Sequence, residues 1–156
     1  MNKQLSLPKG AYFEDFAVGQ EMVTRGRTIT EADVVNFAGL SGDFHPLHTD
    51  EVYAGQQIFG QRVAHGVLGL SVATGLAMGL GVIDESIIAF RELRCRFSKP
   101  IFIGDTIYVR LLITRVKAMP RLNGGLVELD VKVYNQRDQV VQSGSWTVLS
   151  RNREAG

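Results

Sequence analysis

The segment that most constrains the fold is an uncharged stretch, residues 66–83, in which five residues are glycine. It is about as long as a short membrane-spanning helix, but its glycines make it less apolar than such a helix usually is. Leu68, Val72, Leu76 and Leu80 recur with helical spacing on one face, and small residues form a second stripe that permits close approach of other backbone. We therefore predict a long central helix that is enclosed by protein rather than by lipid.

After Asp84 the pattern of side chains changes from helical spacing to alternation. Apolar and polar residues alternate over 93–97, 107–114 and 127–133, and residues 139–149 complete the set. Alternation with a period of two is typical of strands with one buried face, and short connections rich in turn residues favour antiparallel pairing. The apolar face of such a sheet must be covered, and the glycine-rich helix is well suited to cover it. We therefore predict an α+β fold with an antiparallel sheet around this helix.

The length and composition of the chain indicate one domain. Its 156 residues are 45% hydrophobic and 21% charged, so we expect 1–156 to form a single domain with 1–10 as a loose N-terminal arm. The lone cysteine, Cys95, is expected to be a small buried apolar residue without a disulfide. A cytoplasmic location agrees with that expectation. The formal net charge of +1, without a long basic run, argues against a nucleic-acid partner.

Upstream of the glycine-rich helix, turn and capping residues predict shorter elements. Residues 22–29 are expected to form an irregular first strand. Thr30 and Asp33 resemble a capping box for a helix that ends at Gly42, because a glycine past the last turn can adopt the left-handed conformation. A second short helix is expected around residues 51–57, and the segment before it is expected to begin as a loop.

The three histidines of the chain, His45, His48 and His65, all lie between the first helix and the start of the central one, near Asp43 and Asp50. Three interpretations are open. The polar side chains could serve only as helix caps, as Asp50 is well suited to do. Asp43, His45 and His48 could be ligands of an open metal site, although their spacing matches no familiar metal pattern. Asp43 and His48 could instead form an acid/base pair.

The segment Ser41–Asp50 reads Ser-Gly-Asp-Phe-His-Pro-Leu-His-Thr-Asp and resembles the hydratase motif Gly-Asp-x-Asn-Pro-x-His of the MaoC-like, (R)-specific enoyl-CoA hydratase family. Two further matches are Val63–Gly66 and the stretch from Phe97–Pro100 to Gly104–Asp105. The resemblance extends over residues 12–149. It implies a hot-dog fold that pairs its sheet with a second copy in a homodimer or a dimer of dimers. It also implies an acyl thioester as the partner, with no cofactor and no metal.

Carried over by this resemblance, the family's catalytic residues are Asp43 and His48, and His45 stands where the family has asparagine. Hydration of an enoyl thioester needs a base for water, a proton for Cα and stabilisation of negative charge on the thioester oxygen. We expect Asp43 to be the principal base and His48 its partner in proton delivery. The backbone N–H of Gly66, at a helix N-terminus, is expected to bind the thioester oxygen. Further residues expected to contact the substrate less directly are His45, His65, Val63, Ala64, Ser71 and Lys99.

Structural roles compete for several of these residues. His45 could only order its loop, and His65 could only orient the loop and helix. Ser71 could hydrogen-bond to a carbonyl of its own helix, which is the commoner fate of a helical serine. Gly66 could be no more than a tight entry into a crowded helix, and Lys99 could lie on a solvated strand face rather than against a CoA phosphate.

The resemblance implies reversible hydration of a 2-enoyl-CoA to an (R)-3-hydroxyacyl-CoA. Two other functions remain open, because the same fold supports several activities. A thioesterase would attack the carbonyl and release the free CoA thiol. A non-catalytic module would bind an acyl thioester without converting it. The spacing of Asp43 and His48 favours the hydratase over both.

Overall fold

The computed structural model describes residues 7–154 and shows an α+β fold, as the change from helical to alternating patterns predicts. The helical elements are η1 (Phe13–Asp15), α1 (Glu31–Ser41), α2 (Pro46–Thr49), α3 (Glu51–Gly55), α4 (Gly66–Met78) and η2 (Pro120–Leu122). The strands are β1 (Glu21–Val23), β2 (Arg27–Thr28), β3 (Ile87–Phe97), β4 (Thr106–Met119), β5 (Gly124–Tyr134) and β6 (Val140–Arg151).

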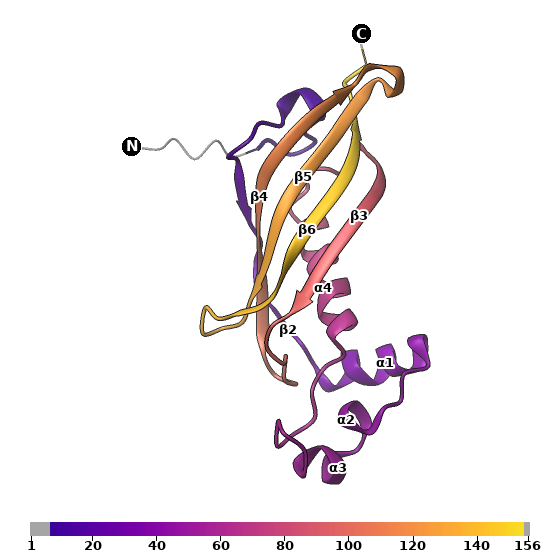
Figure 1. Cartoon of the computed structure of the whole chain (residues 1–156), viewed down its shortest axis with the longest axis vertical. Coiled ribbons are helices and arrows are strands. Elements are labelled where there is room, and N and C mark those ends of the chain that lie inside the picture. The colour runs from indigo at the N-terminus through magenta and orange to yellow at the C-terminus, as the bar shows by residue number, and fades with distance from the viewer. Residues whose placement is uncertain (1–6, 155–156) are drawn as a thin grey trace.

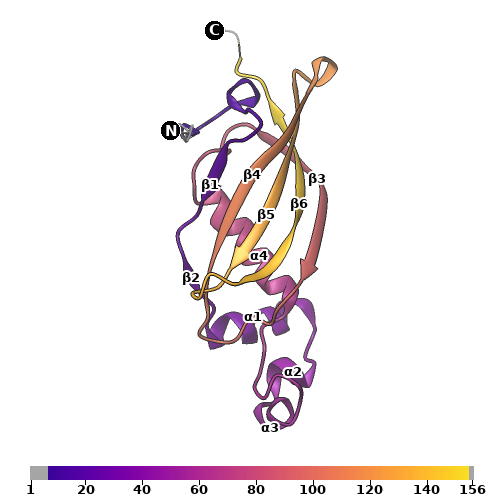
Figure 2. The same ribbon diagram turned by 60° about the vertical axis from the view of Figure 1, so that its left-hand side comes forward.

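The described strands form one antiparallel sheet that curves across α4 (Figure 2). Its strand order is β1-β4-β5-β6-β3, with β2 paired to the first residues of β4. Inward-facing residues such as Ile107, Ile113 and Val131 are almost fully buried, and they pack against the apolar face of α4, which includes Leu68 and Ala73. Removal of this apolar surface from water is the main driving force for the arrangement.

The glycine-rich segment is the central helix, but α4 is shorter than the uncharged stretch. It ends at Met78, and Gly81 has φ +69°, a left-handed conformation that suits glycine and turns the chain out of the helix. Within residues 7–154, no helix combines the length and the apolar character that crossing a membrane requires.

Helix α1 begins and ends as its capping residues predict. The Thr30 side chain accepts a hydrogen bond from the backbone N–H of Asp33, and the Asp33 carboxylate accepts one from the N–H of Thr30. Gly42 follows the last turn with φ 76°, and its N–H donates to the carbonyl of Ala38. These bonds satisfy groups at both helix ends that have no partner within the helix.

Other local predictions need correction. The expected strand over 22–29 is two short strands, β1 and β2. The segment from Asp43 begins as a loop, as predicted, but it continues into the short helix α2, which was not predicted. Helix α3 ends at Gly55, before the predicted limit. Cys95 is half-buried rather than buried, because β3 is an edge strand, paired among the described residues only with β6, and is open to solvent along much of its length.

The predicted loose arm, residues 1–10, lies partly outside the described residues, which begin at Leu7. The described part is held in place. Leu7 packs against the core, and the N–H of Gly10 donates to the carbonyl of Gly81 at 2.8 Å. These four residues therefore lie against the turn that follows α4.

Residues 31–62, which include α1, α2 and α3, form a helical lobe that projects past one end of the sheet (Figure 1). Arg62 connects its parts. The guanidinium donates two hydrogen bonds to the Glu31 carboxylate, at 2.8 and 2.6 Å, and one to Glu51 at 2.7 Å. The two carboxylates raise the pKa of Arg62 above its ordinary value, so this cation is charged at any working pH.

Candidate active site

The residues that sequence reasoning selected as an acid/base pair, Asp43 and His48, lie close together. His48 Nε2 is 3.9 Å from Asp43 Oδ2. On the other side of the ring, His48 Nδ1 lies 2.7 Å from the carbonyl oxygen of Val63 and must therefore donate its proton to it. In the neutral ring, Nε2 is then unprotonated and available as a base that faces the carboxylate.

Burial favours the neutral form of His48. Its side chain is only 14% exposed, and desolvation lowers its pKa below the ordinary value of 6.5. The neighbouring His65 and His45 add to this lowering, whereas the hydrogen bond to Val63 and the Asp43 charge oppose it. A neutral His48 near pH 7 is the protonation state that a general base requires.

His65 supports this pair from behind. It is 3% exposed, its ring stacks on the His48 ring with centroids 3.8 Å apart, and its Nε2 donates to the carbonyl oxygen of Asp43 at 2.9 Å. His65 thus restrains the backbone of Asp43 and the ring plane of His48. This geometry agrees with the orienting role considered for His65.

His45 caps a short helix, a role that the asparagine of the resembled motif could also fill. Its Nδ1 accepts a hydrogen bond from the N–H of Leu47 at 3.1 Å, so His45 is the N-cap of α2, and Pro46 follows at the first helical position. An asparagine Oδ1 can accept the same bond. The backbone N–H of His45 in turn donates to Asp43 Oδ1 at 3.2 Å, which positions the carboxylate.

Gly66 is the first residue of α4, and its N–H lies in the first turn, where helix geometry provides no intrahelical acceptor. A Cβ at this position would lie 2.8 Å from two ring atoms of Phe97. A side chain at position 66 would therefore displace the Phe97 ring, whereas glycine also leaves the first amide of α4 unobstructed.

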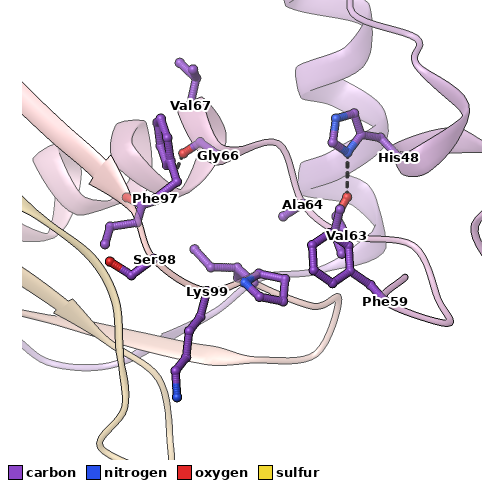
Figure 3. A pocket seen from close by; sticks show the side chains of 12 residues that line it. His48, Phe59, Val63, Ala64, Gly66, Val67, Phe97, Ser98 and Lys99 are labelled. Carbon is purple, nitrogen blue, oxygen red and sulfur yellow. Dashed lines mark hydrogen bonds between the residues drawn. The ribbon is translucent and has the colours of Figure 1, made fainter. Parts of the chain in front are cut away.

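A cavity of about 390 Å³ opens at this end of α4 (Figure 3). His48 and Gly66 both line it, and in Figure 3 the Lys99 side chain points away from them. Asp43, His45, His65 and Ser71 do not line the cavity. The lining residues are His48, Phe59, Val63, Ala64, Gly66, Val67, Phe97, Ser98, Lys99, Pro100, Ile101 and Gln142.

Ser71 is not part of this cavity, contrary to its selection as a substrate contact. Its hydroxyl donates to the Val67 carbonyl at 2.8 Å, and the Thr74 hydroxyl donates to the Ser71 carbonyl at 2.7 Å. Both hydroxyls donate to carbonyls of α4, the alternative considered for Ser71.

The group of side chains that could hold a metal ion differs from the one considered in the sequence. Asp43, His48 and His65 each bring a ligand atom within 4.8 Å of the others, and His45 is not among them. Two ligands of one zinc ion lie about 3.3 Å apart, whereas the closest Asp43 and His48 atoms are 3.9 Å apart. The present spacing therefore suits a shared water better than a shared ion.

Sequence reasoning missed most of the cavity wall on the sheet side, including Phe97, Ile101 and Gln142. One signal was present. Gln142 has the same alternation phase as the inward-facing Trp146 and Val148, so a polar side chain falls at a core position. Such a residue needs an explanation.

Together, the fold and the site define a class of protein: a curved antiparallel sheet around a central helix, with a carboxylate–imidazole pair beside the helix N-terminus. The comparisons with known proteins agree. Residues 15–135 match the model of the MaoC-like domain, and the chain belongs to this family.

Two curated relatives illustrate the relationship. Protein MaoC of Klebsiella aerogenes is 43% identical over 116 residues, which cover 74% of this chain but 34% of that protein. The (R)-specific enoyl-CoA hydratase of Rhodospirillum rubrum is 36% identical over 103 residues, covering 66% of this chain and 69% of that enzyme. The match to Protein MaoC thus spans about a third of that protein.

Solved structures confirm the predicted hot-dog fold. The monoamine oxidase regulatory protein of Archaeoglobus fulgidus superposes with a TM-score of 0.85 at 34% identity, covering 92% of this chain and 96% of that one. A Mycobacterium tuberculosis protein described as a double hotdog fold superposes with a TM-score of 0.76 at 21% identity. It matches 95% of this chain and 47% of its own.

Proposed function

We propose that this protein catalyses the reversible hydration of 2-enoyl-CoA thioesters to (R)-3-hydroxyacyl-CoA. The observation that carries the proposal is the 3.9 Å separation of Asp43 Oδ2 and the unprotonated His48 Nε2 beside the cavity. A water that makes hydrogen bonds of about 2.8 Å to both atoms fits this gap with an angle of about 90° between the two bonds. The names of the hydratase relatives support the same reaction.

In the hydration direction, the Asp43–His48 pair accepts a proton from this water while the water oxygen bonds to Cβ. Negative charge moves onto the thioester oxygen, and the Gly66 N–H at the positive end of α4 stabilises it. The pair then returns one proton to Cα. One water is added in total, and both residues recover their starting protonation states. Dehydration follows the same steps in reverse.

The assembly that we propose is a homodimer joined through β3, with a dimer of dimers as a larger form. The outer edge of β3 has no partner strand within residues 7–154, and Ile88, Phe90 and Phe97 are about half exposed along it. Unpaired apolar edges favour association with another sheet. We also propose a cytoplasmic location, since an acyl-CoA substrate and a free cysteine both suit a reducing compartment.

The test is crotonyl-CoA hydration, followed as loss of enoyl thioester absorbance, with the free CoA thiol assayed in parallel. Wild-type protein should lower the absorbance without releasing thiol, and Asp43→Asn should not. Release of thiol would identify a thioesterase instead. Unchanged absorbance with several enoyl-CoAs that nevertheless bind would identify an acyl-binding module.

A further inference from the structure

Gln142 is a buried polar residue that the mechanism above does not use. It lies on β6 in the cavity wall, and it is 2% exposed. Its Nε2 donates a 2.8 Å hydrogen bond to the carbonyl oxygen of Gly66, and its Oε1 has no hydrogen-bond partner among the described residues. The opposite amide orientation would place two oxygens against each other, so the bond to Gly66 defines the orientation. A buried acceptor without a partner is destabilising, so the presence of Gln142 in the cavity wall needs an explanation.

The residues around the Gln142–Gly66 hydrogen bond leave room for it. Gln142 is the register partner of Phe97 across β6 and β3, so the two side chains lie on the same face of the sheet, under α4. A Cβ on Gly69 would lie 2.6 Å from Gln142 Nε2, just as a Cβ on Gly66 would meet the Phe97 ring. Two glycines three residues apart on α4 therefore admit two paired side chains of the sheet.

The backbone of Gly66 needs a contact from outside α4 to hold its N–H in a fixed direction. Glycine has the broadest backbone freedom of any residue, so it does little to fix the direction of its own N–H. A hydrogen bond to the Gly66 carbonyl restrains the same residue from its C-terminal side. The bond joins segments 76 residues apart, and it therefore ties the first turn of α4 directly to the sheet.

We propose that Gln142 is a positioning residue of the hydratase, which holds the Gly66 N–H in the direction that stabilises the thioester oxygen. This inference rests on the proposed function. It predicts that loss of the Gln142 amide lowers the rate of the chemical step without weakening the fold.

Gln142→Met is the main variant, because methionine has a similar length and removes both the donor and the unpartnered acceptor. The kcat for crotonyl-CoA should fall about 10- to 100-fold, the range expected when an oxyanion donor is displaced, while KM stays within about threefold. The thermal midpoint should be unchanged or raised. Gln142→Asn, too short to reach Gly66, should lower kcat similarly and also lower the midpoint, because it keeps a buried amide.

The matched control is Ser150→Ala. Ser150 is a fully buried residue on the same strand whose hydroxyl also lacks a partner among the described residues, and it does not line the cavity. Its kcat should equal that of the wild type. A wild-type kcat in Gln142→Met, or a lowered kcat that follows only the fraction of unfolded protein, would overturn the proposal.

A spectroscopic measurement separates this inference from the proposed function. A bound 2,4-dienoyl-CoA absorbs at longer wavelength when its carbonyl oxygen is polarised. The red shift should occur in the Asp43→Asn background and disappear when Gln142→Met is added. If the wild type hydrates no enoyl-CoA, the proposed function fails, yet loss of the shift on addition of Gln142→Met would still support the positioning role. A shift that survives Gln142→Met, or no shift in the parent, would refute that role.

Discussion

The sheet with α4 and the helical lobe of residues 31–62 are stabilised by different forces. In the sheet, long stretches of alternating residues bury their apolar side chains against the helix. In the lobe the buried apolar residues are Val34, Ala38 and Ala54, while Leu40 and Ile58 are 85% and 91% exposed. Hydrogen bonds and the Arg62 ion pairs hold the lobe together instead.

The site lies where these two regions meet, and each contributes a different part of it. The lobe supplies Asp43 and His48, the acid/base pair of the proposed reaction, and the buried helix supplies the amide of Gly66 that we propose binds the thioester oxygen. A rigid apolar body can fix a backbone donor, whereas titratable groups need some access to water. We therefore expect substitutions in the lobe to change activity and substitutions in the sheet core away from the cavity to change stability.

The largest effect should come from His48→Gln, which removes the base but keeps a polar side chain. Hydratase kcat should fall by about 10²–10⁴-fold, the usual contribution of a general base. The thermal midpoint should change little, because the residue lies outside the apolar core. Steady-state kinetics with crotonyl-CoA and a thermal melt check both statements; a large loss of stability with little loss of activity would reverse the assignment of roles.

A core substitution should show the opposite behaviour. Ile113 on β4 is 1% exposed, and Ile113→Ala should lower the free energy of unfolding by about 2–5 kcal/mol through lost burial and a residual cavity. At a temperature where the variant remains folded, its kcat should match that of the wild type. Urea unfolding followed by circular dichroism provides the measurement. Equal stability of variant and wild type would show that the sheet is not the stabilising region.

Arg62→Met tests the polar attachment of the lobe. Without the ion pairs to Glu31 and Glu51, Val63 and His48 should lose part of their fixed geometry, and kcat should fall about tenfold. Global stability should change by only about 1 kcal/mol, because the two carboxylates are more than half exposed. Amide hydrogen exchange should increase in residues 43–65 and not in β5. The matched control is Arg115→Met, which breaks an exposed ion pair with Glu128 on the sheet.

The pH dependence of kcat/KM and of stability should show a smaller effect, which comes from His48 in the lobe. Because burial lowers the pKa of His48, the ring stays neutral below pH 6.5, and kcat/KM should decline only as pH falls further, through the lowered value. The unfolded chain binds the proton first, so the His48 contribution to stability is complete above pH 6.5 and is lost as pH falls through the folded pKa. A pH profile of kcat/KM that already declines above pH 6.5 would contradict this prediction.

The smallest effect should come from His45→Asn. Asparagine can also accept the Leu47 N–H as an N-cap, so kcat and stability should remain close to those of the wild type, whereas His45→Ala should lose about 1 kcal/mol of local stability. Kinetics of both variants, with a thermal melt, test this. A severe loss of kcat in His45→Asn alone would give the His45 ring a direct role in catalysis.

The contrast between the regions also explains what the sequence could predict. Strand alternation, the central helix and the caps of α1 are local patterns, and the structure confirms them. The recognised motif brought Asp43, His48 and Gly66 into consideration together. Helix α2 was missed because four residues are too few for a periodic pattern, and its start depends on the unusual cap His45.

Tertiary pairing could not be predicted in the same way. The half-burial of Cys95 depends on β3 being an edge strand, and the sheet-side wall of the cavity depends on register between distant strands. The pairing of Phe97 with Gln142 and their fit to Gly66 and Gly69 involve segments that no local pattern connects.

That fit has an evolutionary consequence. A mutation of Gly69 to alanine would require both Gln142 and Ile101 to shift or to become smaller, and a larger residue at position 66 would displace the Phe97 ring. Position 69 should therefore vary together with positions 101 and 142, and position 66 together with position 97, among related chains. Laboratory recombination between two such relatives should fail most often when the exchanged segment separates α4 from β3 and β6.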